Sequence, residues 1–100
     1  KRVTMELGGH SPAIVCEDAD VKTAVKILSA NKFRNAGQVC ISLQRVVVHQ
    51  KVYADYLDAV KSAVEGISVG DPMEESTKLS AMINEAEAAR VSDWSARRPG

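Results

Sequence analysis

Two cysteines are the first candidates for chemistry in this sequence of 100 residues, because a thiolate is a strong nucleophile. Cys40 follows residues 35–39 (NAGQV), in an expected loop between a helix and a strand. Loops at the ends of rigid elements often present reactive groups. Cys16 lies in the apolar run PAIVC, where a buried strand thiol would be inert packing. The pattern favours Cys40 as the nucleophile. Its position in a loop is equally compatible with a thiol that has no role in catalysis.

Glu6 is the candidate general base. It stands between Met5 and Leu7 and directly precedes two glycines. We expect residues 3–7 to form a short strand that enters a turn at these glycines. Burial at the strand end would make the carboxylate a better general base. A strand-edge glutamate that faces solvent is the alternative, and periodicity leaves both open.

The two histidines of the sequence, His10 and His49, offer a weaker site. A cysteine–histidine enzyme needs a histidine that reaches the thiol and a third group that orients the ring. His49 ends an expected strand nine residues after Cys40, and no Asp or Asn is placed to orient it. The sequence therefore disfavours a cysteine–histidine hydrolase.

Hydrophobic periodicity predicts the elements that position these groups. Residues 12–17 form an apolar run typical of a strand covered on both faces, and residues 46–48 are three valines. Residues 21–28 carry apolar side chains at helical spacing, and residues 17–20 supply an N-cap. One βαβ unit with parallel strands therefore spans residues 12–49, and the fold class is α/β.

Two further helices are expected after the βαβ unit. Residues 53–67 keep helical spacing over four turns. Residues 84–96 begin with Asn84 and Glu87, a capping-box pattern, and Ile83 is available as the hydrophobic staple. One βαβ unit and two further helices therefore account for most of the sequence.

Composition excludes several function classes. Thirteen basic and thirteen acidic residues give a formal net charge of zero, so neither a nucleic-acid partner nor an anionic membrane is expected. No apolar run approaches the roughly 20 residues needed to span a bilayer. Two cysteines without Cys-x-x-Cys spacing form neither a disulfide framework nor a zinc site. Without a signal-peptide pattern at the start of the sequence, a cytoplasmic location is expected.

Two motifs in order, MELGGHSPAIVCEDAD and KFRNAGQVCIS, strongly resemble the aldehyde dehydrogenase superfamily. In that family a Glu-Leu-Gly-Gly block holds the general base and a Gly-Gln-x-Cys block holds the catalytic thiol. Here these residues are Glu6 and Cys40, which stand 34 residues apart, the usual spacing of the family. The resemblance continues through QRVVVHQKVYADYLDAV and GDPMEESTKLSAMINEAEAARV, nearly to the end of the sequence.

The resemblance implies a specific chemistry. Cys40 would attack an aldehyde and form a thiohemiacetal, hydride would leave for NAD or NADP, and water activated by Glu6 would hydrolyse the resulting thioester to an acid. By the same resemblance, the Leu7-Gly8 backbone would lie near the nicotinamide. The expected partners are an aldehyde substrate and further copies of the same chain in a homo-oligomer.

The resemblance also implies that residues 1–100 are one part of an aldehyde dehydrogenase catalytic domain, a partial parallel sheet. By the same resemblance, the cofactor-binding region and the C-terminal part would lie outside the sequence, which itself carries no Gly-x-Gly-x-x-Gly turn. Residues 97–100 end the last helix abruptly, as a natural end, a truncation or a frame change would. The alternative is an inactive truncated or remnant chain with a structural or association role only.

Overall fold

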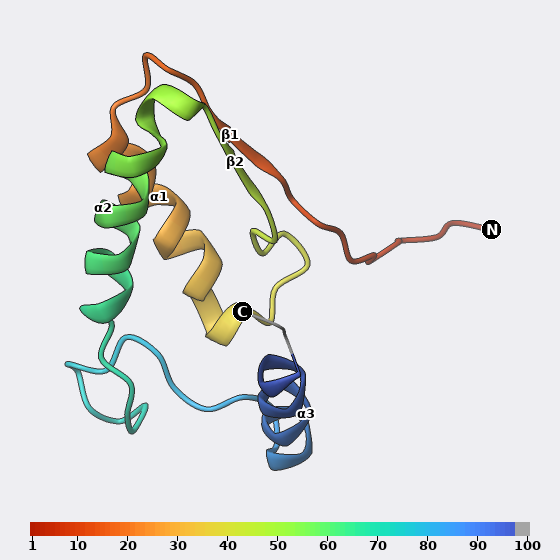
Figure 1. Ribbon diagram of the computed structural model, residues 1–100. Helices are drawn as coiled ribbons and strands as arrows, with labels where there is room; N and C mark the ends of the chain where they lie inside the picture. Colours follow the sequence, from red (N-terminus) through yellow and green to blue (C-terminus); the bar gives the residue numbers. More distant parts are fainter. Residues whose placement is uncertain (98–100) are drawn as a thin grey trace.

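A pair of parallel strands with two helices packed on one face organises the computed structural model, which describes residues 1–97 (Figure 1). The element order is strand, helix, strand, helix, helix, with two short 3-10 turns. The elements are β1 (Ala13–Val15), α1 (Val21–Phe33), η1 (Arg34–Gly37), β2 (Val46–Val48), η2 (Gln50–Val52), α2 (Tyr53–Glu65) and α3 (Glu85–Ala96). The predicted βαβ unit and α/β fold class are confirmed.

The ladder between β1 and β2 sets the register of the unit. Ala13 lies opposite Val46 and Val15 opposite Val48. The same offset extends past the strands, because the Gln44 N–H donates to the His10 carbonyl at 3.1 Å. Helix α1 makes the crossover that a parallel pair requires. Segments that precede β1 and β2 therefore leave the same end of the pair.

The expected strand over residues 3–7 is wrong. Residues 1–12 contain no strand, and the N-terminal segment runs away from the helices (Figure 1). The positive φ of Ser11, 36°, interrupts the ladder between His10 and β1. Val3, Met5 and Leu7 are largely exposed. A strand needs a neighbour for its backbone groups, and among residues 1–97 none lies along this segment.

The strand predicted over residues 12–17 is shorter and is covered on one face only. Val15 is buried against the helices, whereas Ile14 and Val47, on the opposite face, are 76% and 59% exposed. Cys16 follows β1 and is exposed, so the prediction of a buried strand thiol is also wrong. The two-sided burial that the apolar run predicts requires a layer that residues 1–97 do not contain.

The core lies between the strand pair and two helices. Val15, Val25 and Tyr56 form its centre, one each from β1, α1 and α2. Partly buried apolar residues surround them, including Leu28, Val46, Val48, Val60 and Ala63. The periodic apolar positions predicted for α1 and α2 thus pack against one another and against one face of the sheet. This packing holds α1, and the loop that follows it, relative to β2.

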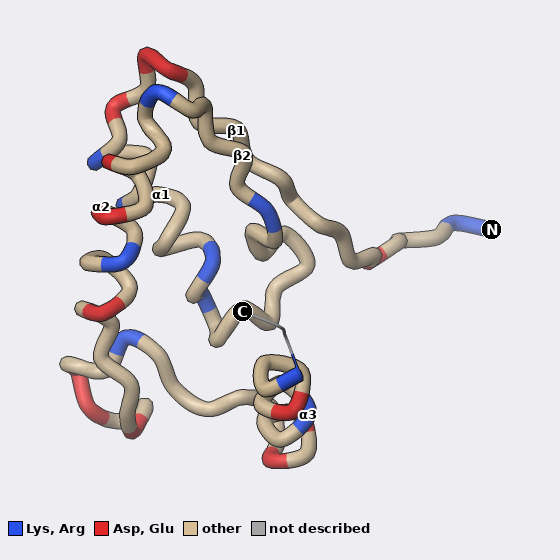
Figure 2. The backbone as a smooth tube through the Cα atoms, viewed as in Figure 1, with Lys and Arg blue, Asp and Glu red and all other residues tan. Residues whose placement is uncertain are grey.

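Charged residues of both signs occur on α2 and on α3, whereas the charged residues of α1 are all lysines (Figure 2). Within residues 1–97 no helix is long and apolar enough to cross a membrane, and no cluster of three metal-ligating side chains is found. Helix α3 ends at Ala96, with Arg97 as its C-cap, and the remainder of the predicted abrupt stop over residues 97–100 lies outside the described residues.

Asp20 is the N-cap of α1, as the sequence predicts. Its carboxylate accepts from the backbone N–H groups of Lys22 at 3.0 Å and Thr23 at 3.3 Å, and from the Thr23 hydroxyl at 2.8 Å. The hydrogen bonds from Thr23 hold the pKa of Asp20 below its ordinary value of 3.8. The ionised cap therefore stabilises the folded chain above pH 3.8, and this stabilisation is lost as pH falls through the lowered pKa.

Substitution of Asp20 by Asn tests this cap. Asp20→Asn removes the charge and the acceptor for the Thr23 hydroxyl, so the urea midpoint of unfolding should fall at pH 7. The difference from the parent chain should narrow below pH 3.8, where the parent carboxylate also becomes protonated. The control is Asp58→Asn on α2, because Asp58 is exposed and its carboxylate makes no hydrogen bond within residues 1–97. A gap that stays constant from pH 7 to pH 2.5 would contradict the assignment.

Candidate active site

Cys40 lies at the corner of a tight turn between η1 and β2. The Ser42 N–H donates to the Val39 carbonyl at 2.9 Å, which places Cys40 and Ile41 at the two central positions. The Cys40 thiol is exposed, and its backbone N–H makes no hydrogen bond with another residue in the described range 1–97. The turn therefore presents both an accessible sulfur and a free N–H donor, in the loop that the sequence predicts.

The approach to this turn has an unusual backbone. Asn35, Ala36 and Gly37 all have positive φ, at 51°, 56° and 77°. Such angles are unfavourable for residues other than glycine, so other contacts must hold them. The Asn35 side-chain amide donates to the Gln38 carbonyl at 3.3 Å, and the Gln38 amide donates to the Asn35 carbonyl at 3.0 Å. This reciprocal pair clamps the backbone turn that leads to Cys40.

Ser42 anchors the other side of the turn. It is the most deeply buried side chain of the described residues, and its Oγ lies 3.4 Å from the Lys32 carbonyl at the end of α1. A buried hydroxyl requires a partner, and a carbonyl of the last helical turn lacks one within the helix. Sequence analysis missed Ser42, although a small polar residue between Ile41 and Leu43 was a usable signal. Cys40 is thus held on both sides.

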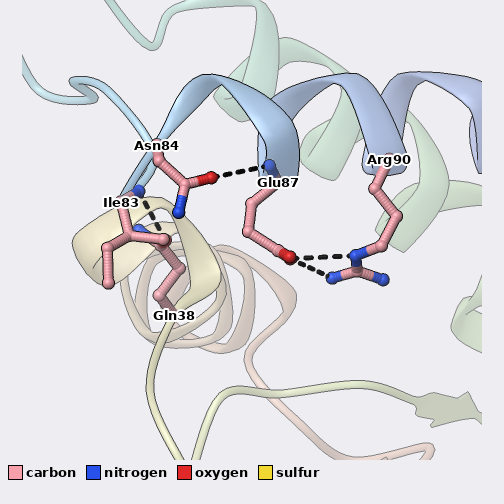
Figure 3. Close-up of polar contacts among 5 residues, drawn as sticks. All are labelled: Gln38, Ile83, Asn84, Glu87 and Arg90. Carbon is pink, nitrogen blue, oxygen red and sulfur yellow. Dashed lines mark hydrogen bonds and ion pairs between the residues drawn. The ribbon is translucent and has the colours of Figure 1, made fainter.

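The turn is also joined to the start of α3 (Figure 3). The Gln38 Oε1 accepts from the Ile83 N–H at 2.9 Å. Asn84 caps α3, as predicted, by accepting from the Glu87 N–H at 2.9 Å. The Glu87 carboxylate, however, accepts from Arg90 rather than from Asn84, so only half of the capping box forms. Ile83 is 79% exposed, and its predicted role as a staple is wrong.

Glu6 is exposed, so the buried alternative is wrong for this chain. It precedes β1 by seven residues, and Cys40 precedes β2 by six, so both leave the same end of the parallel pair. Within residues 1–97 no hydrogen bond joins Glu6 to Cys40. Leu7 and Gly8 are exposed beside Glu6, and a Cβ added to Gly8 would meet no atom within 4 Å. This open space leaves the Leu7-Gly8 backbone accessible to a flat ring.

His49 is engaged elsewhere. Its Nδ1 accepts from the Lys51 N–H at 3.3 Å, and the side chain thereby caps η2. It lies at the carboxyl end of β2, whereas Cys40 precedes the amino end of that strand. His49 and Cys40 therefore lie beyond opposite ends of β2.

Comparison with known proteins decides the family. Residues 1–99 match the model of the Aldehyde dehydrogenase family. The chain belongs to this family. It is 44% identical over 94 residues to a 3-sulfolactaldehyde dehydrogenase of Priestia megaterium, covering 94% of this chain and 20% of that relative. It is 43% identical over 91 residues to a mitochondrial succinate-semialdehyde dehydrogenase of Oryza sativa subsp. japonica, covering 91% and 17%.

Solved structures of aldehyde dehydrogenases share this fold. A lactaldehyde dehydrogenase matches with a TM-score of 0.86 at 36% identity, over 92% of this chain and 20% of that one. A 3,6-anhydro-L-galactose dehydrogenase in complex with NAP matches with a TM-score of 0.86 at 38% identity, over 91% and 19%. The resemblance found in the sequence is confirmed. The chain spans about one fifth of the length of the relatives that it matches.

Gly37 provides a test of the backbone before Cys40. Gly37→Ala should lower the free energy of unfolding by about 1 kcal/mol or more, because alanine disfavours a positive φ. The matched control is Gly66→Ala at the end of α2, where φ is −80° and a Cβ would lie 3.6 Å from the Ser62 carbonyl. Urea unfolding of both variants is the measurement. Equal destabilisation by the two substitutions would contradict a left-handed Gly37.

Proposed function

We propose that this chain is the part of a longer aldehyde dehydrogenase that supplies the nucleophile and the general base for NAD(P)-dependent oxidation of an aldehyde to a carboxylic acid. The observation that carries the proposal is the exposed thiol of Cys40, held at a turn anchored on both sides, in a chain of this family. The parts that bind most of the cofactor, and the C-terminal part of the catalytic domain, lie in the remaining four-fifths of such an enzyme.

Cys40 forms the covalent bond to the substrate. Its thiolate adds to the carbonyl carbon, a carbon–sulfur bond forms, and the carbonyl electron pair moves to oxygen. The resulting thiohemiacetal oxyanion needs hydrogen-bond donors. The free backbone N–H of Cys40 is one such donor, because a thiolate that attacks from this residue leaves the new oxyanion close to its own amide.

Glu6 completes the reaction by removing a proton from water. The hydroxide so formed attacks the thioester carbon, the carbon–sulfur bond breaks, and Cys40 returns as a thiolate. The shared strand end from which Glu6 and Cys40 emerge supports this pairing of roles. Since no described contact fixes Glu6 within residues 1–97, the rest of the enzyme would set its position.

Leu7 and Gly8 would lie beside the nicotinamide ring of NAD or NADP. NAD(P), when bound, accepts the hydride from the substrate carbon. The accessible backbone at Gly8 fits close approach of a flat ring, because no side chain intervenes. The solved relatives include enzymes in complex with NAP and with NADP. Which aldehyde is oxidised depends on residues outside this segment.

Alanine substitution of each cysteine in the enzyme that contains this chain tests the nucleophile. Cys40→Ala should lower kcat about a thousandfold or more, because no thioester can form. Cys16→Ala is the matched control, since Cys16 is also exposed but follows the carboxyl end of β1. NADH absorbance with an aldehyde substrate is the measurement. Equal loss from both substitutions, at equal thermal stability, would sink the proposal.

Substitution of Glu6 by Gln separates the base from the nucleophile. Glu6→Gln keeps size but removes the carboxylate, so thioester hydrolysis should slow about a hundredfold while the first turnover still releases NADH rapidly. Stopped-flow measurement should therefore show a burst followed by slow turnover. Glu75→Gln, another exposed carboxylate, is the control. Steady-state turnover of Glu6→Gln at the parent rate would remove Glu6 from the mechanism.

A further inference from the structure

We infer that Gln38 is a positioning residue for Cys40, and this inference rests on the proposed function. Its side-chain amide joins the loop that carries the thiol to the start of α3, and it also holds the backbone turn that leads into that loop. Gln38 does not touch the substrate in this scheme. It acts through the placement of the sulfur atom two residues further along the chain.

The two halves of the amide have different partners (Figure 3). Oε1 accepts from the Ile83 N–H at 2.9 Å, across 45 residues of sequence. Nε2 donates to the Asn35 carbonyl at 3.0 Å. The Ile83 N–H immediately precedes the cap of α3 and cannot bond within that helix. Only a side chain with both a donor and an acceptor at its end makes both contacts.

The contact with Ile83 has no substitute in the described part of the chain. Among residues 1–97 it is the one hydrogen bond between residues 34–45 and residues 80–97. A cleft of about 480 Å³ separates the rest of this loop from α3, lined in part by Gln38, Gln44, Glu87 and Arg90. Without the Gln38 amide, no hydrogen bond of the described residues would hold this loop at a fixed distance from α3. The separation between the loop and α3 would then be poorly defined.

The contact with Asn35 acts on the backbone. Asn35 and Ala36 occupy left-handed conformations that such residues disfavour. The Gln38 side chain opposes their return to ordinary angles by donating to the Asn35 carbonyl, beside the Gln38 backbone N–H, which donates to the same oxygen at 3.1 Å. Cys40 follows this turn directly, so relaxation of the turn would move the thiol. Attack on a carbonyl requires the reacting atoms to approach within about 3–3.5 Å in the correct direction. The step that depends on Gln38 is therefore formation of the carbon–sulfur bond.

The test uses the full-length aldehyde dehydrogenase that contains this chain. Gln38→Met keeps the length of the side chain and removes both hydrogen bonds. It should slow NADH formation in the first turnover about tenfold, with the dissociation constant of the aldehyde unchanged within about twofold. Gln50→Met is the matched control, because Gln50 is exposed and its side chain makes no hydrogen bond within residues 1–97. Thermal unfolding measured beside the kinetics reports any loss of stability.

A second variant keeps one of the two contacts. Gln38→Glu still offers an acceptor to the Ile83 N–H but places a carboxylate oxygen against the Asn35 carbonyl. Gln38→Glu should also slow the first-turnover release of NADH at least threefold. If Gln38→Met does not fold, this variant tests the positioning role of Gln38 in its place. A burst rate within twofold of the parent in either folded variant would overturn the inference. Failure of both variants to fold, beside a normal Gln50→Met enzyme, would also overturn it by making Gln38 a folding residue.

The outcome is distinguishable from failure of the proposed function. Cys40→Ala decides whether the thiol is the nucleophile, whatever Gln38 does. An inactive Cys40→Ala enzyme with a parental burst in Gln38→Met would overturn the positioning role alone. Slower NADH release in the first turnover of Gln38→Met also differs from the effect expected for Glu6→Gln. In Glu6→Gln the first turnover stays rapid, and only the later hydrolysis of the thioester slows.

Discussion

The parallel pairing of β1 with β2 is the interaction on which the rest of the structure depends. The ladder fixes which residues of the two segments stand opposite one another, and it requires a crossover, which α1 supplies. Burial of Val15 beneath Val25 and Tyr56 stabilises the pair from one side. Because the strands run in the same direction, the segments before them leave the sheet at one end. The segments that carry the proposed base, Glu6, and the proposed nucleophile, Cys40, therefore leave the same end of the strand pair. In the sequence these two residues are 34 positions apart.

The loop before Cys40 combines an unfavourable backbone with several compensating contacts. Three consecutive left-handed residues turn the chain sharply after α1. The Asn35–Gln38 pair and the buried Ser42 hydroxyl oppose relaxation of that turn from its two sides. Strained backbone persists only where surrounding contacts over-determine it, and it concentrates at functional sites. Here the result is a thiol that is open to solvent while its backbone is held firmly.

Local signals in the sequence predicted local structure well. Asp20 and Asn84 cap the helices that follow them, because a cap depends on residues two or three positions away. The failures concern burial. The strand expected over residues 3–7, the buried one of the two alternatives for Glu6, and a buried Cys16 each require a neighbour that residues 1–97 do not include. The hydrogen bond between Gln38 and Ile83 could not be predicted from the sequence either, since no periodic pattern links residues 45 positions apart. The proposed roles of Cys40 and Glu6 rest on two motifs at a family spacing, because neither residue type alone specifies that chemistry.

The two proposed catalytic groups differ in how their positions are determined. Cys40 is held by contacts within this chain, from Asn35, Gln38 and Ser42. Glu6 lies in a segment whose apolar neighbours, Met5 and Leu7, are exposed, and the outer sheet face at Ile14 and Val47 is exposed as well. Apolar surface of this extent favours burial against further structure, and the relatives are about five times as long as this chain. The geometry of the proposed nucleophile is therefore intrinsic to the segment, whereas the geometry of the proposed base would be imposed by the parts of the enzyme that cover residues 3–7. In the proposed mechanism, Glu6 would activate water only when those parts are in place.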